Sequence, residues 1–220
     1  MIFEFFQAAP VPSSAHADSL VCVVDDDAGV RRSLERLFRS ARLPVETFAS
    51  VAEYLRRTEY PGPVCLVLDV RMPGLDGFDL QAMLGERPEQ VVFLTSHGDV
   101  AMCAKALKAG AVDFLTKPAD DEVLLAAASQ ALEQAREIAA SQAARDASRS
   151  MLRSLTPREF QVMEQVVAGL LNKQIAAVLG IAEKTVKIHR GRVMKKTRCR
   201  SVPDLMRVVL KAGDMEPPVA

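Results

Sequence analysis

From Leu20 onward, the chain alternates short apolar runs with segments whose apolar residues recur at helical spacing. The apolar runs are LVCVV (20–24), PVETF (44–48), VCLVL (64–68), VVFLT (91–95) and AVDFLT (111–116). The segments between them cover 29–41, 50–58, 77–85 and 99–110 and have the apolar positions of amphipathic helices. Regular alternation of strand and helix predicts a parallel sheet with helices on both faces.

The stretch that follows this alternation has a different pattern. Residues 119–156 contain neither Gly nor Pro and are rich in Ala, Glu, Gln and Arg, which predicts one long linker helix. Leu125, Leu132 and Ala139 recur every seven residues with small residues between them. That spacing permits a weak coiled coil. A solitary, partly frayed helix is the alternative.

Short helices are predicted after the linker. Thr156, Pro157 and Glu159 form the pattern of an N-cap, a first helical residue and a capping-box partner, so a helix is expected from there to Gly169. Ser201, with Asp204 three residues later, is expected to cap the last helix.

Between these two lies a pair of helices around a short turn. Asn172 is expected to cap the first, which ends at Gly180, and the second covers about Glu183 to Lys196. Residues 173–200 hold nine Lys and Arg against one acid. A short helix, a Gly-containing turn and a basic second helix predict a helix-turn-helix that binds DNA.

Charge divides the chain in the same place. Residues 151–220 carry 13 Lys and Arg against 6 Asp and Glu, whereas the whole chain carries 28 of each, so residues 1–150 have a net charge of −7. Only the basic C-terminal part is therefore expected to meet a polyanion.

The basic helix has two distinct faces. At about 100° per residue, Val186, His189 and Val193 fall on the side that packs against the core. His189 is accordingly interpreted as a packed residue. Arg192 and Arg198 lie off the opposite face and suit phosphate contacts. The residues expected to contact DNA are Lys184, Lys187, Ile188, Arg190, Gly191 and Lys195.

Polar residues follow the predicted strands where each strand ends. Asp25 and Asp26 follow the first run and Asp69 follows the third. Because the carboxyl ends of parallel strands meet at one edge of a sheet, these three carboxylates are expected to converge there. Adjacent carboxylates repel, so the arrangement requires a cation, and Mg²⁺ suits a few carboxylates with water and phosphate oxygens. Asp27 is instead expected to favour the start of the next helix.

The same edge receives two further groups, because Thr95 ends the fourth run and Lys117 follows the fifth. A central carboxylate beside a metal ion, with a lysine and a hydroxyl opposite, is suited to accepting a phosphoryl group as an aspartyl-phosphate. Asp69, on the central strand, is the predicted acceptor, and Lys117 and Thr95 are predicted to bind the phosphoryl oxygens.

These motifs resemble, in order and spacing, the receiver domain of a bacterial two-component response regulator. They are VVDDD (23–27), LVLDVRMPGLDG (66–77), VVFLTSHGD (91–99) and GAVDFLTKP (110–118). The resemblance implies a flavodoxin-like α/β fold with a five-stranded parallel sheet in the order 2-1-3-4-5, and a cis bond between Lys117 and Pro118. It also implies that the backbone carbonyl of Arg71 is a further Mg²⁺ ligand and that Phe114 is an aromatic switch.

The C-terminal part resembles the LuxR-type output domain, and the two parts in this order resemble the FixJ-type (NarL/FixJ) response regulators. The resemblance implies a cytoplasmic regulator, not an enzyme, that receives phosphate from a sensor histidine kinase, dimerises, and binds promoter DNA in concert with RNA polymerase. Ala182 departs from the family, which usually has Ser or Thr as the N-cap there. The expected division is an extension (1–18), a receiver domain (19–136), a linker helix (137–152), an all-α helix-turn-helix domain (153–212) and a tail (213–220).

Composition excludes several other classes of protein. No apolar run approaches the ~20 residues that a membrane span requires. The N-terminus has no Lys or Arg and lacks the pattern of a secretory signal. The four cysteines are widely spaced, which favours reduced thiols over a zinc site or a disulfide framework.

Two alternatives to a phosphorylation-switched regulator fit part of the sequence. A Mg²⁺-dependent phosphohydrolase would use a similar aspartate, but it would have a second acid where Arg71 stands. A DNA-binding regulator whose receiver never accepts phosphate would have the same helix-turn-helix.

Overall fold

The computed structural model describes residues 18–85 and 87–213 and divides into two compact units, Met1–Ala139 and Ala140–Ala220. The extension predicted over 1–18 and the tail predicted over 213–220 lie almost entirely outside the described residues.

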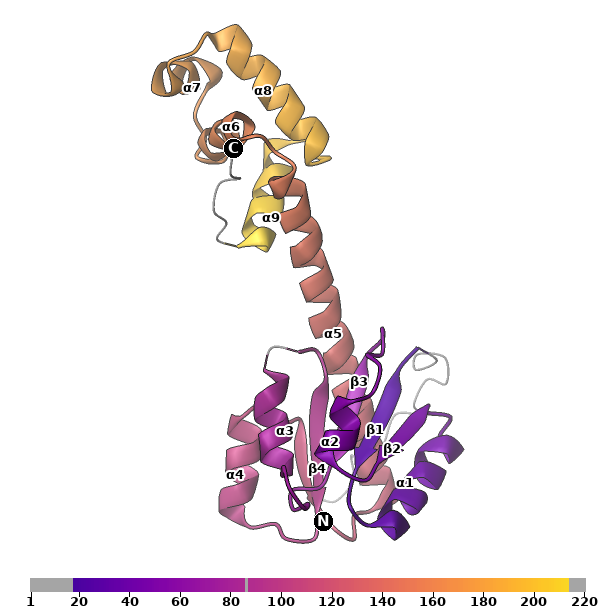
Figure 1. The fold of residues 1–220 in the computed structure, drawn as a ribbon. Coiled ribbons are helices and arrows are strands. Elements are labelled where there is room, and N and C mark those ends of the chain that lie inside the picture. The colour runs from indigo at the N-terminus through magenta and orange to yellow at the C-terminus, as the bar shows by residue number, and fades with distance from the viewer. Residues whose placement is uncertain (1–17, 86, 214–220) are drawn as a thin grey trace, which may run out of the picture. The chain divides into compact units, whose positions relative to one another are not determined.

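The N-terminal unit is built on a parallel sheet in the order β2-β1-β3-β4-β5 (Figure 1), which confirms the predicted topology. Its strands are β1 (Leu20–Val24), β2 (Val45–Phe48), β3 (Val64–Leu68), β4 (Gln90–Thr95) and β5 (Asp113–Thr116). All five residues of β1 and of β3 are buried, as expected of strands covered on both faces. β5 begins later than the apolar run predicts, because the Ala111 N–H bonds to the Ala106 carbonyl at the end of the preceding helix.

Helices cover both faces of this sheet. They are α1 (Ala28–Ser40), α2 (Val51–Leu55), α3 (Gly77–Leu84), α4 (Val100–Lys108) and the first turns of α5 (Asp121–Arg153). One core joins α1 and α5 to the sheet through Phe38 and Leu132, and the other joins α2 and α3 to the opposite face through Tyr54 and Leu80. α2 is shorter than the predicted 50–58, since Arg57 leaves the helix to donate to the Tyr54 hydroxyl and to pair with Glu89.

Short polar caps start the helices at the carboxyl edge of the sheet. Asp27 accepts hydrogen bonds from the Gly29 and Val30 N–H groups at the start of α1, as predicted. Asp76 caps α3, and Asp99 caps α4. A Cβ on Gly77 would lie 2.4 Å from the Asp69 carbonyl oxygen, so only glycine permits α3 to begin so close to the end of β3.

Helix α5 is continuous over its 33 residues, as the lack of Gly and Pro predicts. Leu132 is fully buried in the core of the N-terminal unit, and Leu125 packs against the same core. Both leucines of the seven-residue spacing therefore pack within that unit, Leu132 fully and Leu125 in part.

The C-terminal unit is all helical. It contains the end of α5, α6 (Pro157–Val167), α7 (Asn172–Leu179), α8 (Glu183–Lys196) and α9 (Val202–Ala212). The predicted caps at Thr156 and Ser201 are confirmed, and the bounds of α8 agree with the sequence prediction. Val162, Ile175, Val186 and Leu205, one residue from each of α6 to α9, are fully buried and form the centre of its core.

The prediction that Asn172 caps α7 is wrong. Leu171 occupies the N-cap position, and Asn172 is the first residue of the helix. The Gln174 side chain accepts from the Leu171 N–H, and the Asn172 side-chain oxygen instead accepts from Arg190 Nη1 at 3.0 Å. A bond from a charged donor is stronger than a neutral cap bond, which explains why this amide faces α8.

The cysteines are free thiols, with Cys22 and Cys65 buried and Cys103 and Cys199 half-buried, and none forms a disulfide. Burial raises the pKa of Cys22 to about 12. No helix in residues 18–85 and 87–213 is both long and apolar enough to cross a membrane.

Candidate functional site

Three carboxylates converge at the carboxyl edge of the sheet. Asp25 follows β1 and Asp69 follows β3, and one carboxylate oxygen from each of Asp25, Asp26 and Asp69 lies within 4.8 Å of the others. Asp25 and Asp69 are buried, with exposed fractions of 2% and 8%, whereas Asp26 is exposed. We call this group of three residues, together with Lys117, the acidic edge. The convergence predicted from the strand order is confirmed by these distances.

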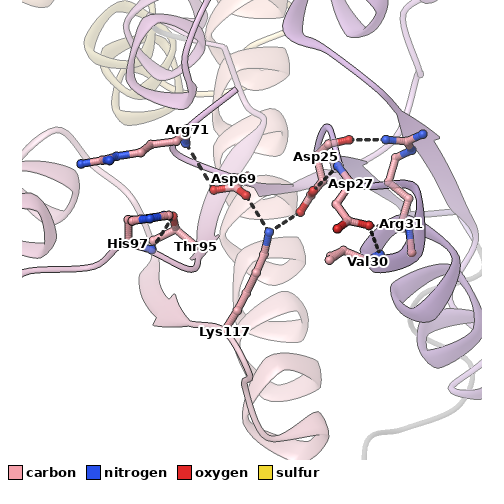
Figure 2. A network of polar contacts seen from close by, with 10 residues as sticks. Asp25, Asp27, Val30, Arg31, Asp69, Arg71, Thr95, His97 and Lys117 are labelled. Carbon is pink, nitrogen blue, oxygen red and sulfur yellow. Dashed lines mark hydrogen bonds and ion pairs between the residues drawn. The ribbon is translucent and has the colours of Figure 1, made fainter. Parts of the chain in front are cut away.

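Lys117 places its ammonium between two of these carboxylates (Figure 2). Its Nζ lies 2.5 Å from Asp25 Oδ2 and 2.6 Å from Asp69 Oδ2, so the ammonium of Lys117, which follows β5, bridges the carboxylates that follow β1 and β3. Burial raises the pKa of Asp25, and the bond from Lys117 offsets only part of this effect. Burial alone lowers the pKa of Lys117, but its bonds to the two carboxylates outweigh burial and raise it. The lysine is therefore held in its charged form.

Thr95 is fully buried at the end of β4, and its carbonyl oxygen accepts from the Lys117 N–H at 2.9 Å. Its hydroxyl oxygen accepts from the His97 N–H at 3.3 Å, in the loop that leads to α4. His97 itself is exposed, as predicted for a loop residue. The peptide bond between Lys117 and Pro118 is cis, as expected from the resemblance.

Phe114 on β5 lies under the same loop. Its ring centroid is 5.9 Å from that of Phe93, and a Cβ on Gly98 would lie 2.9 Å from its ring edge. Gly98 therefore permits the loop to pass directly over the Phe114 ring. This contact links the loop that Thr95 holds to the aromatic residue predicted as a switch.

Arg71 and Asp27 border the acidic edge without joining the carboxylate group. The Arg71 N–H donates to Asp69 Oδ1 at 3.3 Å, and Figure 2 shows the Arg71 side chain extending away from Asp69. Hydrogen bonds from the Val30 and Gly29 N–H groups lower the pKa of Asp27. Asp27 is thus a helix cap, in agreement with the sequence interpretation.

The second charged site is the outer face of α8. Lys184, Lys187 and Lys195 are exposed, and among the described residues their side chains make no hydrogen bond or ion pair. Ile188 and Gly191 are also exposed, and a Cβ on Gly191 would meet no described atom within 4 Å. We call these five residues the groove face. Val186 and Val193 are buried on the opposite side, as predicted.

Two other predicted residues of α8 lie between its faces. Arg190 is half-buried and donates to Asn172 on α7, so it braces the two helices of the pair. His189 is half-buried, and its Nδ1 has no hydrogen-bond partner among the described residues. Ala182 is the N-cap of α8 and provides no side-chain cap bond.

An ion pair that fixes the end of α8 was not predicted from the sequence. Lys196 Nζ lies 2.6 Å from Glu159 Oε2 and also donates to the Ser154 carbonyl oxygen at 2.9 Å. Burial raises the pKa of Glu159, but bonds from Lys196 and Thr156 outweigh it and lower the pKa. The sequence showed Glu159 only as a capping-box residue. Its second role depends on how α6 and α8 pack, and no local pattern encodes that packing.

Comparisons with known proteins identify the families of both domains. Residues 21–129 match the response regulator receiver domain, and residues 153–209 match the bacterial regulatory proteins of the luxR family. Nodulation protein W of Bradyrhizobium diazoefficiens is 48% identical over 198 residues, which cover 89% of this chain and 87% of that protein. The transcriptional regulatory protein FixJ of the same organism is 40% identical over 195 residues, covering 88% of this chain and 95% of that protein. A solved structure of the response regulator StyR is 44% identical, has a TM-score of 0.79, and covers 89% of this chain and 100% of that one.

A receiver fold with an acidic edge, followed by a helix-turn-helix domain, defines a DNA-binding response regulator. The chain belongs to the FixJ-type (NarL/FixJ) family of these regulators. It is a transcriptional regulator of a two-component system.

Proposed function

We propose that Asp69 accepts a phosphoryl group from a sensor histidine kinase and that the aspartyl-phosphate switches DNA binding by the output domain. The observation that carries this proposal is the bridging position of Lys117, whose ammonium contacts both Asp25 and Asp69. A phosphoryl group on Asp69 brings oxygens to the place where that ammonium already lies. Asp69 also follows the central strand of the sheet, because β3 lies between β1 and β4.

The acidic edge suits Mg²⁺, and this structure supports the fit through the chemistry of its donors. Asp25, Asp26 and Asp69 bring three carboxylate oxygens within 4.8 Å of one another, and carboxylates are ligands that Mg²⁺ prefers. We assign these three residues and the Arg71 backbone carbonyl as its ligands. When bound, Mg²⁺ neutralises and orients phosphoryl oxygens.

In the proposed transfer, an Asp69 carboxylate oxygen attacks the phosphorus of the kinase phosphohistidine. A new O–P bond forms, the P–N bond breaks, and the histidine leaves as imidazole after taking up a proton. Lys117 moves its ammonium from the free carboxylates to the phosphoryl oxygens. The Thr95 hydroxyl turns to a phosphoryl oxygen and gives up its bond from the His97 N–H, which releases the loop over Phe114.

We infer that this rearrangement changes the α4–β5 surface and favours a homodimer that binds two half-sites in promoter DNA. Phosphate shifts this equilibrium only if it binds one conformer more tightly than the other. The groove face, together with Arg190, contacts bases and backbone, and RNA polymerase is the further partner at the promoter. The protein is proposed to act in the cytoplasm, without a catalytic turnover of its own, with a receiver over 19–136, a linker over 137–152 and an output domain over 153–212.

Labelling with a small phosphodonor tests the proposal. Acetyl phosphate with Mg²⁺ is expected to add one phosphoryl group to the full chain and to raise its dimer fraction. Asp69→Asn is expected to abolish both effects while the variant still folds cooperatively. Intact-mass spectrometry and analytical ultracentrifugation measure them. Undiminished labelling of Asp69→Asn overturns the assignment, and failure to label the wild type favours a regulator that acts without phosphate.

A further inference from the structure

Arg31 makes a short contact with the acidic edge that no sequence motif assigned. It lies in the first turns of α1, and its Nη1 donates to the backbone carbonyl oxygen of Asp25 at 2.6 Å (Figure 2). The Asp25 N–H donates a hydrogen bond to the Phe48 carbonyl at the end of β2. No described backbone N–H donates to the Asp25 carbonyl. Arg31 is half-buried, so this charge-assisted bond is partly shielded from water.

The three carboxylates of the acidic edge differ in how they are held. Asp25 accepts from the Asp27 N–H and from Lys117, and Asp69 accepts from the Arg71 N–H and from Lys117. The Asp26 carboxylate is exposed and makes no hydrogen bond within the described part of the chain. The position of the Asp26 carboxylate is therefore set by the conformation of the Asp26 backbone.

The carbonyl that Arg31 holds belongs to the peptide unit between Asp25 and Asp26. A bond to this oxygen restricts rotation of the peptide plane and so fixes the direction in which the Asp26 side chain leaves the backbone. We propose that Arg31 is a positioning residue that aims Asp26 at the Mg²⁺ proposed for this site. This inference rests on the proposed function, because it assumes that Asp26 is a metal ligand.

The charge of Arg31 and its proposed positioning role predict opposite effects on Mg²⁺ affinity when the residue is replaced. A guanidinium near a divalent cation repels it, so charge alone predicts that removing Arg31 tightens Mg²⁺ binding. Groups that orient metal ligands contribute to affinity, and their loss typically weakens binding roughly 10–100-fold. A positioning role therefore predicts that removing Arg31 weakens Mg²⁺ binding although the site becomes more negative.

The neighbouring Arg32 offers a matched control. It is exposed on the same helix, its charge acts on the Asp27 carboxylate, and its side chain makes no hydrogen bond to the described residues. Arg31→Gln and Arg32→Gln remove the same charge from adjacent positions, but only the first removes the bond to Asp25. Arg31→Lys keeps the charge and loses the guanidinium geometry.

The test is a Mg²⁺ titration of the full chain followed by the amide NMR signals of Asp26 and Asp69. Arg31→Gln is expected to raise the dissociation constant roughly tenfold or more, and Arg31→Lys to raise it by a smaller factor. Arg32→Gln is expected to leave it unchanged or lower it. An unchanged or lower dissociation constant in Arg31→Gln overturns the inference. If that variant does not fold, an unchanged value in Arg31→Lys overturns it instead.

Asp26→Asn separates failure of this inference from failure of the proposed function. If Asp26→Asn binds Mg²⁺ as the wild type does, Asp26 is not a ligand, so the proposed ligand set is wrong and Arg31 has no positioning role. If Asp26→Asn weakens binding and Arg31→Gln does not, the metal site stands and only the positioning role is overturned. Weakening in both variants, with Arg32→Gln unaffected, supports both.

Discussion

At the acidic edge, Asp25 and Asp69 are buried and share one lysine, whereas on the groove face Lys184 and Lys187 are exposed and make no ion pair with described residues. The first arrangement suits a small group of fixed geometry, because Asp25, Asp69 and Lys117 already hold one another in place. The second suits a long polyanion, because unpaired surface lysines lose little when they contact phosphates. Lysine therefore occurs in two settings, shared by two buried carboxylates at the acidic edge and unpaired among the described residues on the groove face.

This comparison is tested most strongly by removing Lys117. Lys117→Met leaves Asp25 and Asp69 without their shared cation, and loss of one partner from a buried ion pair typically costs roughly 3–5 kcal/mol. We expect urea unfolding of the receiver, measured without Mg²⁺, to show a loss of about 3 kcal/mol. Lys108→Met, at an exposed position on α4, is expected to change stability by less than about 0.5 kcal/mol.

A second substitution sharpens this result. Asp25→Asn added to Lys117→Met removes one of the repelling carboxylates and is expected to recover part of the lost stability. Equal stability of Lys117→Met and the wild type would show that the acidic edge does not depend on its lysine for folding.

The output domain also contains an ion pair of a buried acid, Glu159, with Lys196 at the end of α8. Glu159→Gln removes a charged hydrogen bond and is expected to cost about 2 kcal/mol near neutral pH. Because the pKa of Glu159 is lowered below its ordinary value of 4.5, its contribution is present above that pH and is lost as pH falls through the lower folded value.

The pH dependence of unfolding measures this contribution. As pH falls below about 4.5, the wild type is expected to lose more stability than Glu159→Gln, so that the two curves converge. Parallel curves across this range would mean that the ion pair does not stabilise the domain.

Replacing Lys187 tests whether the groove face contributes to DNA binding and not to stability. Lys187→Ala is expected to leave the free energy of unfolding within about 0.5 kcal/mol of the wild type, because the side chain has no partner in the described structure. On a duplex selected from a random pool by the phosphorylated protein, it is expected to cost ~1–3 kcal/mol of binding and relax the preference at one base step. Equal losses on selected and scrambled duplexes would place Lys187 on phosphates instead of bases.

Arg198 gives the smallest expected effect. It is exposed just beyond α8 and is predicted to contact phosphate only. Arg198→Ala is expected to weaken all duplexes about equally and to lower the slope of log affinity against log salt by about one unit. Titrations at several salt concentrations measure the slope, and a loss confined to the selected duplex would contradict the assignment.

The sequence predicted the parts of this molecule that depend on local pattern and strand order. The apolar runs predicted β1 and β3. The order of the strands predicted that Asp25 and Asp69, which are far apart in the chain, lie at one edge of the sheet. The bounds of α8 followed from its charge and from the Gly180 turn. Sheet topology made these side chains predictable because one edge collects the ends of all the strands.

The contacts missed by the sequence are those that join separate elements. Asn172 was assigned as a cap because its type suits that place, but the packing of α8 brought Arg190 within reach of its side chain. The Arg31 bond to the Asp25 carbonyl and the pair of Glu159 with Lys196 likewise require the positions of two packed elements. No periodicity or cap signal reports such distances.

The central claim is that phosphate on Asp69 controls DNA binding by α8. Its most direct test is the dissociation constant for a selected duplex with two half-sites, measured with and without acetyl phosphate for the wild type and Asp69→Asn. Phosphodonor is expected to tighten binding of the wild type, and more so than on a single half-site, because a dimer gains effective concentration at its second site. Asp69→Asn is expected to bind weakly in both conditions. Equally tight binding by the wild type without phosphodonor, or a gain that persists in Asp69→Asn, would contradict the account.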